Sequence, residues 1–209
     1  MIEIRKFVVG PLSTNMYLII SGKEAVVIDP GENSAQMLEF ASENGIRVKY
    51  ALATHGHFDH INGSGKVCGS LGCLFCINEN DAEMAMKNPE SMKSFMGVMG
   101  EYIDIGSTFS DGSEFKFGNE TIRAMQTPGH TAGSTCFVTG SYIFSGDTIF
   151  RGTIGRTDIG GSGSDMAKTL EKFRSMEGEY RIYPGHGADT TLDHEKRTNP
   201  FLIDPESAL

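Results

Sequence analysis

The chain has 209 residues, of which 18 are basic and 27 acidic, and its formal net charge is −9. This length suffices for one large domain that folds without disulfides, and no linker or change of composition divides it, so we predict a single domain over residues 1–209. The acidic balance disfavours binding to nucleic acids and anionic membranes. The sequence shows neither a secretory signal pattern nor an apolar run long enough to cross a membrane, so we expect a cytoplasmic protein.

The first part of the chain is predicted to alternate strands and helices. Apolar runs bounded by turn residues predict strands over 2–9, 16–20, 25–28, 46–54 and 72–77. Helical spacing predicts a helix that is capped at Asn33 or Ser34 and closed by Gly45. A second helix is predicted over 61–70, and a short third helix over 82–87 is predicted to be capped by Asp81.

Residues 84–102 form an unusual segment, with five methionines, Phe95 and Tyr102, interrupted by Pro89 and Gly97. Methionine commonly fills gaps in apolar cores. Long irregular segments often carry binding residues, so a flexible apolar wall or lid beside a binding site is the alternative. Both interpretations remain open from the sequence.

The four cysteines are predicted to be structural. Cys73 and Cys76 form a Cys-x-x-Cys pattern, and Cys68 and Cys136 lie outside it. A zinc or redox site of this type would require a second pair or a helix start. We predict instead that the pattern belongs to a short buried strand, because free cysteine packs well in cores.

The second part of the chain is also rich in predicted strands. Two hairpins are predicted over 115–127 and 134–145, and a strand over 180–183. Residues 149–163 contain many glycines and are predicted to form a loop. Asp165 is predicted to open a helix with Met166, Leu170 and Phe173 on one face, and a last short helix is predicted over 191–198.

The main chemical signal is the stretch His55 to His60, which reads His-Gly-His-Phe-Asp-His. Imidazole and carboxylate are the ligands that zinc and iron commonly take in proteins. His55 and His57 can converge on one ion, while Asp59 and His60 turn toward a second. The stretch therefore predicts a metal site.

Other potential ligands follow predicted strands in the same way. His130, Asp147 and His186 each stand beside a glycine just past a strand, as does His55. We expect residues at the carboxyl ends of strands on one sheet edge to converge. Five histidines and two aspartates make seven ligands, which is about the number that two ions sharing a carboxylate and a water require. His194, on the last predicted helix, is expected to lie at the surface.

Five blocks of this sequence resemble the metallo-β-lactamase superfamily, and within it the glyoxalase II (hydroxyacylglutathione hydrolase) branch. They are Asp29-Pro30-Gly31, residues 54–60, residues 127–131, Gly146-Asp147-Thr148 and Pro184-Gly185-His186-Gly187. The resemblance implies an α/β fold, the four-layer αβ/βα sandwich. It also implies that His55, His57 and His130 bind a first metal, that Asp59, His60 and His186 bind a second, and that Asp147 bridges them.

The resemblance further implies a short, single-domain hydrolase. The C-terminal helical domain of glyoxalase II has no counterpart here, and its glutathione-binding lysine and tyrosine are matched by Arg156 and Asp158. We therefore expect Arg156 to bind a carboxylate of the substrate. Asp59 is expected to take part in catalysis as well as in metal binding.

The predicted function is hydrolysis of a small-molecule thioester, such as S-D-lactoylglutathione, with two Zn²⁺ ions as cofactors and Fe or Mn as alternatives. A mononuclear iron persulfide dioxygenase on the same scaffold is the rival enzyme, for which His55, His130 and Asp147 would supply the facial triad. A non-catalytic metal-binding module is a third hypothesis, but a structural zinc site is closed at four ligands. The sequence does not define the oligomeric state.

Overall fold

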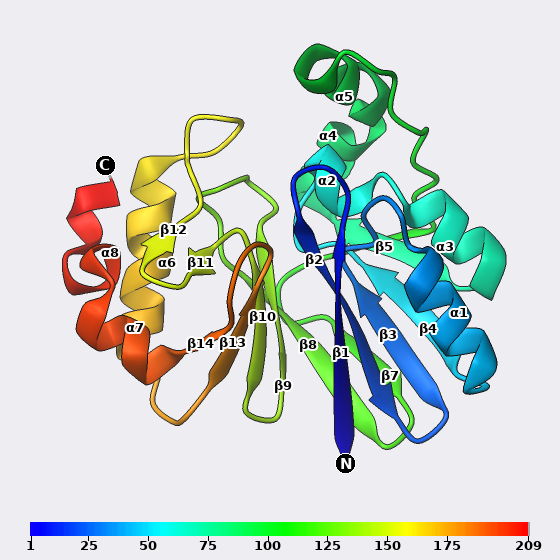
Figure 1. The fold of residues 1–209 in the computed structure, drawn as a ribbon. Helices are drawn as coiled ribbons and strands as arrows, with labels where there is room; N and C mark the ends of the chain where they lie inside the picture. Colours follow the sequence, from blue (N-terminus) through cyan, green and yellow to red (C-terminus); the bar gives the residue numbers. More distant parts are fainter. Residues whose placement is uncertain (209) are drawn as a thin grey trace.

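The computed structural model describes residues 1–208 as two mixed β-sheets that pack face to face, with helices on their outer sides (Figure 1). In spatial order, the first sheet contains β1 (Ile2–Val9), β2 (Thr14–Ser21), β3 (Glu24–Ile28), β4 (Arg47–Leu52), β5 (Leu74–Asn78) and β6 (Ser107–Phe109). The second contains β14 (Thr190–Thr191), β13 (Arg181–Pro184), β10 (Tyr142–Gly146), β9 (Thr135–Thr139), β8 (Glu120–Gln126) and β7 (Glu114–Phe117). The predicted α/β sandwich of four layers is confirmed.

Each sheet has helices on its outer face. The first sheet is covered by α1 (Ala35–Glu43) and α3 (Ser64–Leu71), and the second by α6 (Gly163–Ser175), α7 (Leu192–Thr198) and α8 (Pro200–Ile203) (Figure 1). At the upper end of the view lie α2 (Phe58–Ile61), α4 (Ala82–Met86) and α5 (Asn88–Met96). A small hairpin, β11 (Ile149–Phe150) and β12 (Thr153–Ile154), and the 3₁₀ turns Glu79–Asp81 and Pro205–Ala208 complete the described elements. Among residues 1–208, no helix has the length and apolarity to cross a membrane.

The packing explains why β2 reads as an uninterrupted apolar run. Met16, Leu18 and Ile20 face the helices on the outside of the first sheet. Tyr17 and Ile19 face the second sheet and pack with its aromatic residues. A strand with both faces buried needs apolar residues at every position, whereas a half-buried strand alternates. β2 therefore contributes side chains to both the outer and the inner core.

Several predicted boundaries are wrong. The helix predicted over 61–70 is split, because α2 ends at Ile61 and α3 begins at Ser64. The N–H of Gly63 donates to Pro30 O (2.9 Å), and a Cβ at Gly63 would come within 1.9 Å of Gly31 O. The chain therefore turns at Gly63 against the 30–31 loop, a contact distant in sequence that local periodicity does not reveal.

Other elements also differ from the prediction. Gly163 begins α6 and the Ser162 hydroxyl caps it, accepting from Asp165 N, so Asp165 lies inside the first turn. The segment 84–102 includes α5, which starts around Pro89, a residue well suited to a first helical turn. β6 and α8 were not predicted, and the loop over 149–163 contains a small hairpin.

The cysteine pattern is partly as expected. Cys76 is buried in β5, whereas Cys73 precedes the strand. The Sγ atom of Cys73 lies 3.2 Å from that of Cys68, at the end of α3. The close pair is thus Cys68 and Cys73, not the two members of the Cys-x-x-Cys pattern.

Candidate metal centre

Seven potential ligands meet where the loops after strands of both sheets come together. His55 follows β4 in the first sheet, while His130, Asp147 and His186 follow β8, β10 and β13 in the second. Their convergence was predicted, but not its location. They meet across the two sheets rather than along one sheet edge, because the sheets pack face to face with these strand ends together.

The first group of donors consists of His55, His57 and His130. Their nearest ring nitrogens all lie within 4.8 Å of one another. Nδ1 of His57 is 2.8 Å from Nε2 of His130. Nε2 of His55 is buried and has no hydrogen-bond partner within residues 1–208. A buried polar atom without a partner is costly, so this nitrogen fits a bound ion.

The second group consists of Asp59, His60 and His186. Oδ2 of Asp59 lies 3.3 Å from Nε2 of both histidines, and the two Nε2 atoms are 3.3 Å apart. Asp59 and His60 are consecutive residues of α2, and His186 approaches from the loop after β13. Two imidazoles and a carboxylate at these separations fit a second ion.

Asp147 lies between the two groups. Its Oδ1 is 3.4 Å from His60 Nε2, and its Oδ2 is 3.6 Å from His130 Nε2 and 3.5 Å from His186 Nε2. Oδ1 is buried and has no hydrogen-bond partner among the described residues. The donor set therefore fits a pair of ions with Asp147 as the shared carboxylate.

Hydrogen bonds fix which nitrogen of each histidine is free for a metal. Thr54 Oγ1 donates to Asp29 Oδ2, so it accepts from Nδ1 of His55 at 3.0 Å. Nδ1 of His130 donates to Arg156 O (2.7 Å), and Nε2 of His57 donates to Ile159 O (3.2 Å). The remaining nitrogens are those that face one another in the first group, and such contacts typically orient metal-binding imidazoles.

Burial keeps the first group neutral. It lowers the pKa of His55 well below the ordinary value, and neighbouring histidines lower it further. Burial likewise lowers the pKa of His57, and that of His130 to about 3. Neutral imidazoles carry the lone pair that a metal requires, so this group is ready to bind an ion at neutral pH.

The second group and Asp147 have a different electrostatic balance. For His60, burial opposes protonation, but the carboxylates of Asp59, Asp147 and Asp29 outweigh it and raise the pKa to about 10. Burial would raise the pKa of Asp59, but His60 and His186 hold it below the ordinary value. Burial raises the pKa of Asp147 to about 6. Positive charge is needed to balance these carboxylates. A proton on His60 supplies part of it, and a metal ion would supply more.

Asp29, the first residue of the Asp29-Pro30-Gly31 block, supports two segments of the site. Its Oδ2 accepts from Nδ1 of His60 at 2.9 Å, and its two oxygens accept from the N–H and hydroxyl of Thr54 at 2.7 and 2.9 Å. Asp29 is 1% exposed and has a φ of 54°, which aspartate tolerates better than most residues. Asp29 therefore orients the ring of His60 and holds Thr54, the residue before His55.

Thr14 and Asn15 are positioning residues that sequence reasoning missed. Thr14 Oγ1 donates to Asp59 Oδ2 at 2.7 Å, and Asn15 Nδ2 donates to the carbonyls of Pro184 and Gly187. Thr14 thus connects the start of β2 to α2, and Asn15 connects it to the loop that carries His186. The available signal was weak, because two polar residues before an apolar strand are ordinary turn chemistry.

Asp81 stands at the N-cap position of α4, as predicted, but its side chain has another role. Its side chain makes no cap hydrogen bond. Instead its oxygens accept from Gly56 N (2.9 Å), Thr131 Oγ1 (2.7 Å) and Gly133 N (2.7 Å). Asp81 is 1% exposed, so one buried carboxylate joins the loop of His55 and His57 to the loop of His130.

Gly185 allows the second group to form. A Cβ at this position would come 2.2 Å from Asp147 Oδ1 and 2.7 Å from Cε1 of His60. The chain before His186 can approach the other ligands only because no side chain stands there. The glycine beside His186 is thus a requirement of the site, as its position in the sequence suggested.

A cavity of about 410 Å³ opens beside the donors. Its lining includes five of the seven ligands together with Leu12, Phe58, Ser91, Ser94, Phe95, Arg156 and Ile159. Arg156 therefore lies where a substrate-binding residue was expected. Its guanidinium, however, makes two bonds of 2.6 Å to the carboxylate of Asp158.

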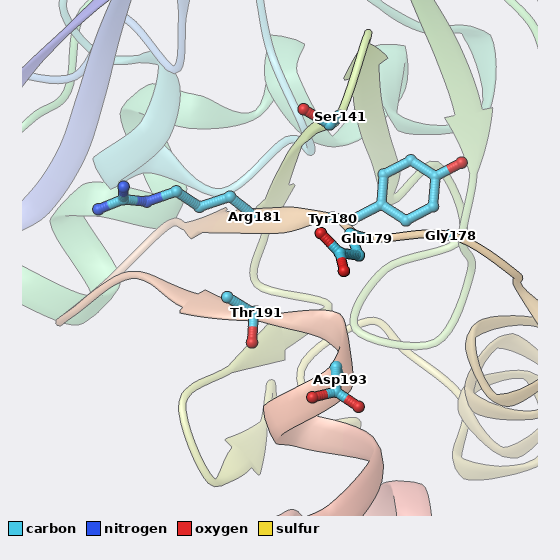
Figure 2. A pocket seen from close by; sticks show the side chains of 7 residues that line it. All are labelled: Ser141, Gly178, Glu179, Tyr180, Arg181, Thr191 and Asp193. Atoms are coloured by element: carbon cyan, nitrogen blue, oxygen red, sulfur yellow. The ribbon is translucent and has the colours of Figure 1, made fainter.

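Two features lie away from this centre. A cavity of about 620 Å³ is found at the start of β13, the end opposite to His186. Figure 2 shows that Tyr180 and Arg181 point in opposite directions there, and its lining contains none of the clustered donors. His194, expected at the surface, is partly exposed and belongs to none of the donor groups found among the described residues.

Comparison with known proteins agrees with this geometry. A family model for the metallo-beta-lactamase superfamily matches residues 9–186. A hydroxyacylglutathione hydrolase, GloC, of Haemophilus influenzae is 30% identical over 86% of this chain and 88% of its own. A crystal structure of the BLEG-1 B3 metallo-beta-lactamase superposes with a TM-score of 0.89 at 26% identity, covering 96% of this chain and 99% of its own. The di-iron-bound form of TTHA1623 superposes with a TM-score of 0.86 at 30% identity, covering 94% and 99%.

Proposed function

Because the chain belongs to the metallo-β-lactamase superfamily, as the family match over residues 9–186 shows, we propose that this metal-dependent hydrolase cleaves thioesters. The observation that carries the proposal is the donor arrangement. Seven ligands form two groups that share Asp147, and a cavity of about 410 Å³ adjoins them. The similarity to a hydroxyacylglutathione hydrolase makes S-D-lactoylglutathione the first substrate to test.

We assign His55, His57 and His130 to one ion, and Asp59, His60 and His186 to the other, with Asp147 between them. Zinc is the proposed metal, with iron or manganese as alternatives, since imidazole and carboxylate suit all three. Two divalent ions in such a site supply an ionised water at neutral pH and polarise a carbonyl oxygen.

The protein's own residues prepare the reaction in three ways. Asp29, Thr54 and the carbonyl of Arg156 hold the imidazoles with the correct nitrogen facing the centre. Thr14 fixes the carboxylate of Asp59, whose pKa lies below the ordinary value, so Asp59 would hold an ion, and face a water on it, in its ionised form. The leaving thiolate needs little protonation, so no separate general acid is required.

The proposed function can be tested on protein purified without added metal. We expect about two metal ions per chain, mainly zinc, by elemental analysis, as a shared-carboxylate site requires. We also expect release of free thiol from S-D-lactoylglutathione without oxygen consumption. One iron per chain, with oxygen uptake on addition of glutathione persulfide, would instead identify a persulfide dioxygenase.

A further inference from the structure

The cavity beside the donors has an apolar wall, formed by Leu12, Phe95 and Ile159. They come from three separate segments: the turn between β1 and β2, helix α5, and the loop after β12. Their exposed fractions are 38%, 60% and 39%. Single exposed apolar side chains are ordinary, but several that gather around one cavity are typical of a binding surface.

One residue of the wall, Phe95, packs on a buried side chain. Phe58, which is 8% exposed and lies in α2 directly before the ligand Asp59, packs against Phe95 with ring centroids 5.5 Å apart. The aromatic ring of α5 is thus held next to the helix that carries two of the ligands. The donors and this wall line the same cavity, so a ligand at the donors lies beside the wall.

The rest of the lining offers little for an anionic ligand. Arg156 is the one lysine or arginine among the described residues that line the cavity, and Asp158 accepts from its Nε and Nη2 atoms. Ser91 and Ser94 of α5 add neutral hydroxyl groups. A ligand carboxylate would therefore meet an arginine whose charge Asp158 already balances, while an apolar group needs no partner of opposite charge.

Resting on the thioester hydrolase function proposed above, we propose that the cavity selects thioesters that carry an uncharged apolar substituent, which packs on Leu12, Phe95 and Ile159. The wall and the donors line one continuous cavity, so the substituent and the carbonyl can be bound together. The apolar group could stand on the acyl side or on the thiol side of the carbonyl. The contact with the wall is the same in both cases, and the experiment below distinguishes the two positions.

The test uses two series of neutral thioesters and the metal-loaded protein. One series lengthens the acyl chain from acetyl to octanoyl on a constant thiol, and the other lengthens the alkyl thiol on a constant acetyl group. We expect kcat/KM to rise about two- to fourfold per methylene in one series until the wall is covered, as partial to full burial of a methylene implies. The series that shows this dependence identifies the side of the carbonyl that packs on the wall.

Two exposed residues of the same segment provide a matched pair of variants. Phe95→Ala should flatten the chain-length dependence, and Phe95→Leu should restore part of it. Val98→Ala, at a residue that is 55% exposed and does not line the cavity, should keep the wild-type dependence. Thermal unfolding of each variant verifies that the fold is retained, which the exposure of both side chains favours.

The outcomes separate this inference from the proposed function. Hydrolysis of every thioester with no dependence on chain length in either series would overturn the apolar selection and leave thioester hydrolysis standing. Cleavage of S-D-lactoylglutathione with a higher kcat/KM than all apolar substrates would also overturn the apolar selection alone. Absence of hydrolysis of any thioester by protein that holds its metal would overturn both.

Discussion

At the scale of the residue, hydrogen bonds from residues outside the donor set orient the imidazole rings of the histidines. His60 presents Nε2 to Asp59 and Asp147 because Nδ1 is held by Asp29. Imidazole has two chemically similar nitrogens, and the partner of one decides which lone pair is left for the ion. The carboxylate of Asp29 thereby acts on the centre through His60.

Asp29→Asn tests this positioning role. Asparagine keeps the size of the side chain and tolerates the positive φ, but its single oxygen cannot accept from both the Thr54 N–H and Nδ1 of His60, which bond to different oxygens of Asp29. We expect metal affinity to fall about 10- to 100-fold, measured by competition with a chromophoric chelator. Asp193→Asn, which removes only an exposed carboxylate, is the control. Unchanged affinity of the Asp29 variant would mean that packing alone orients the ring.

Arg156 contributes to the site through two different groups. Its carbonyl accepts from Nδ1 of His130, while its guanidinium is bonded to Asp158. Because an alanine keeps the carbonyl, we expect Arg156→Ala to change KM for anionic and neutral thioesters alike, within about twofold, as for an exposed ion pair. A rise in KM confined to anionic substrates would show that the guanidinium leaves Asp158 to bind a substrate carboxylate, as the sequence suggested.

At the scale of the element, short loops rather than the strands themselves bring the donors together. The loop after β4 carries His55 and His57, and the loop after β8 carries His130. Asp81, in the 3₁₀ turn before α4, accepts bonds from both loops. An element that contributes no ligand therefore sets the distance between ligands of the first group.

Asp81→Ala should reduce the free energy of unfolding by about 3 kcal/mol, because two buried N–H groups and a hydroxyl lose their acceptor. The measurement is urea unfolding, with a lower midpoint and an unchanged m value. The matched control is Asp193→Ala, which breaks an exposed pair with Arg197 and should cost no more than about 0.5 kcal/mol. Equal losses in the two variants would contradict a bridging role for Asp81.

At the scale of the whole molecule, the donor set connects the two sheets. His55, His57, Asp59 and His60 come from the part of the chain that follows β4, while His130, Asp147 and His186 follow strands of the second sheet. An ion in either group would be bound by residues of both parts. Metal binding is therefore coupled to the stability of the complete sandwich.

Removal of metal by a chelator should lower Tm. Ions present at a thousandfold excess over their dissociation constant stabilise the fold by about 4 kcal/mol, which corresponds to about 8–16 °C for a chain of this size. Differential scanning calorimetry with and without chelator measures the shift. His194→Ala should keep the full shift, and Asp147→Ala should lose most of it. A shift that persists in the Asp147 variant would place the stabilising ion elsewhere.

The sequence by itself determined the chemical identity of the site and much of the framework. The spacing from His55 to His60 and the glycines beside His130, Asp147 and His186 identify potential ligands from residue type and local order alone. Runs such as β2 are recognisable because burial on both faces requires consecutive apolar residues. These are properties of residues near one another in the chain.

Only the tertiary structure decided which distant groups meet. Asp29 bonds His60, Asp81 bonds Thr131, and the ligands converge across two sheets, because sheet packing brings together loops that are far apart in sequence. The break between α2 and α3 has the same origin, in the contact of Gly63 with residues 30–31. Periodicity and propensity describe local preferences, and they contain no information about a partner many residues away.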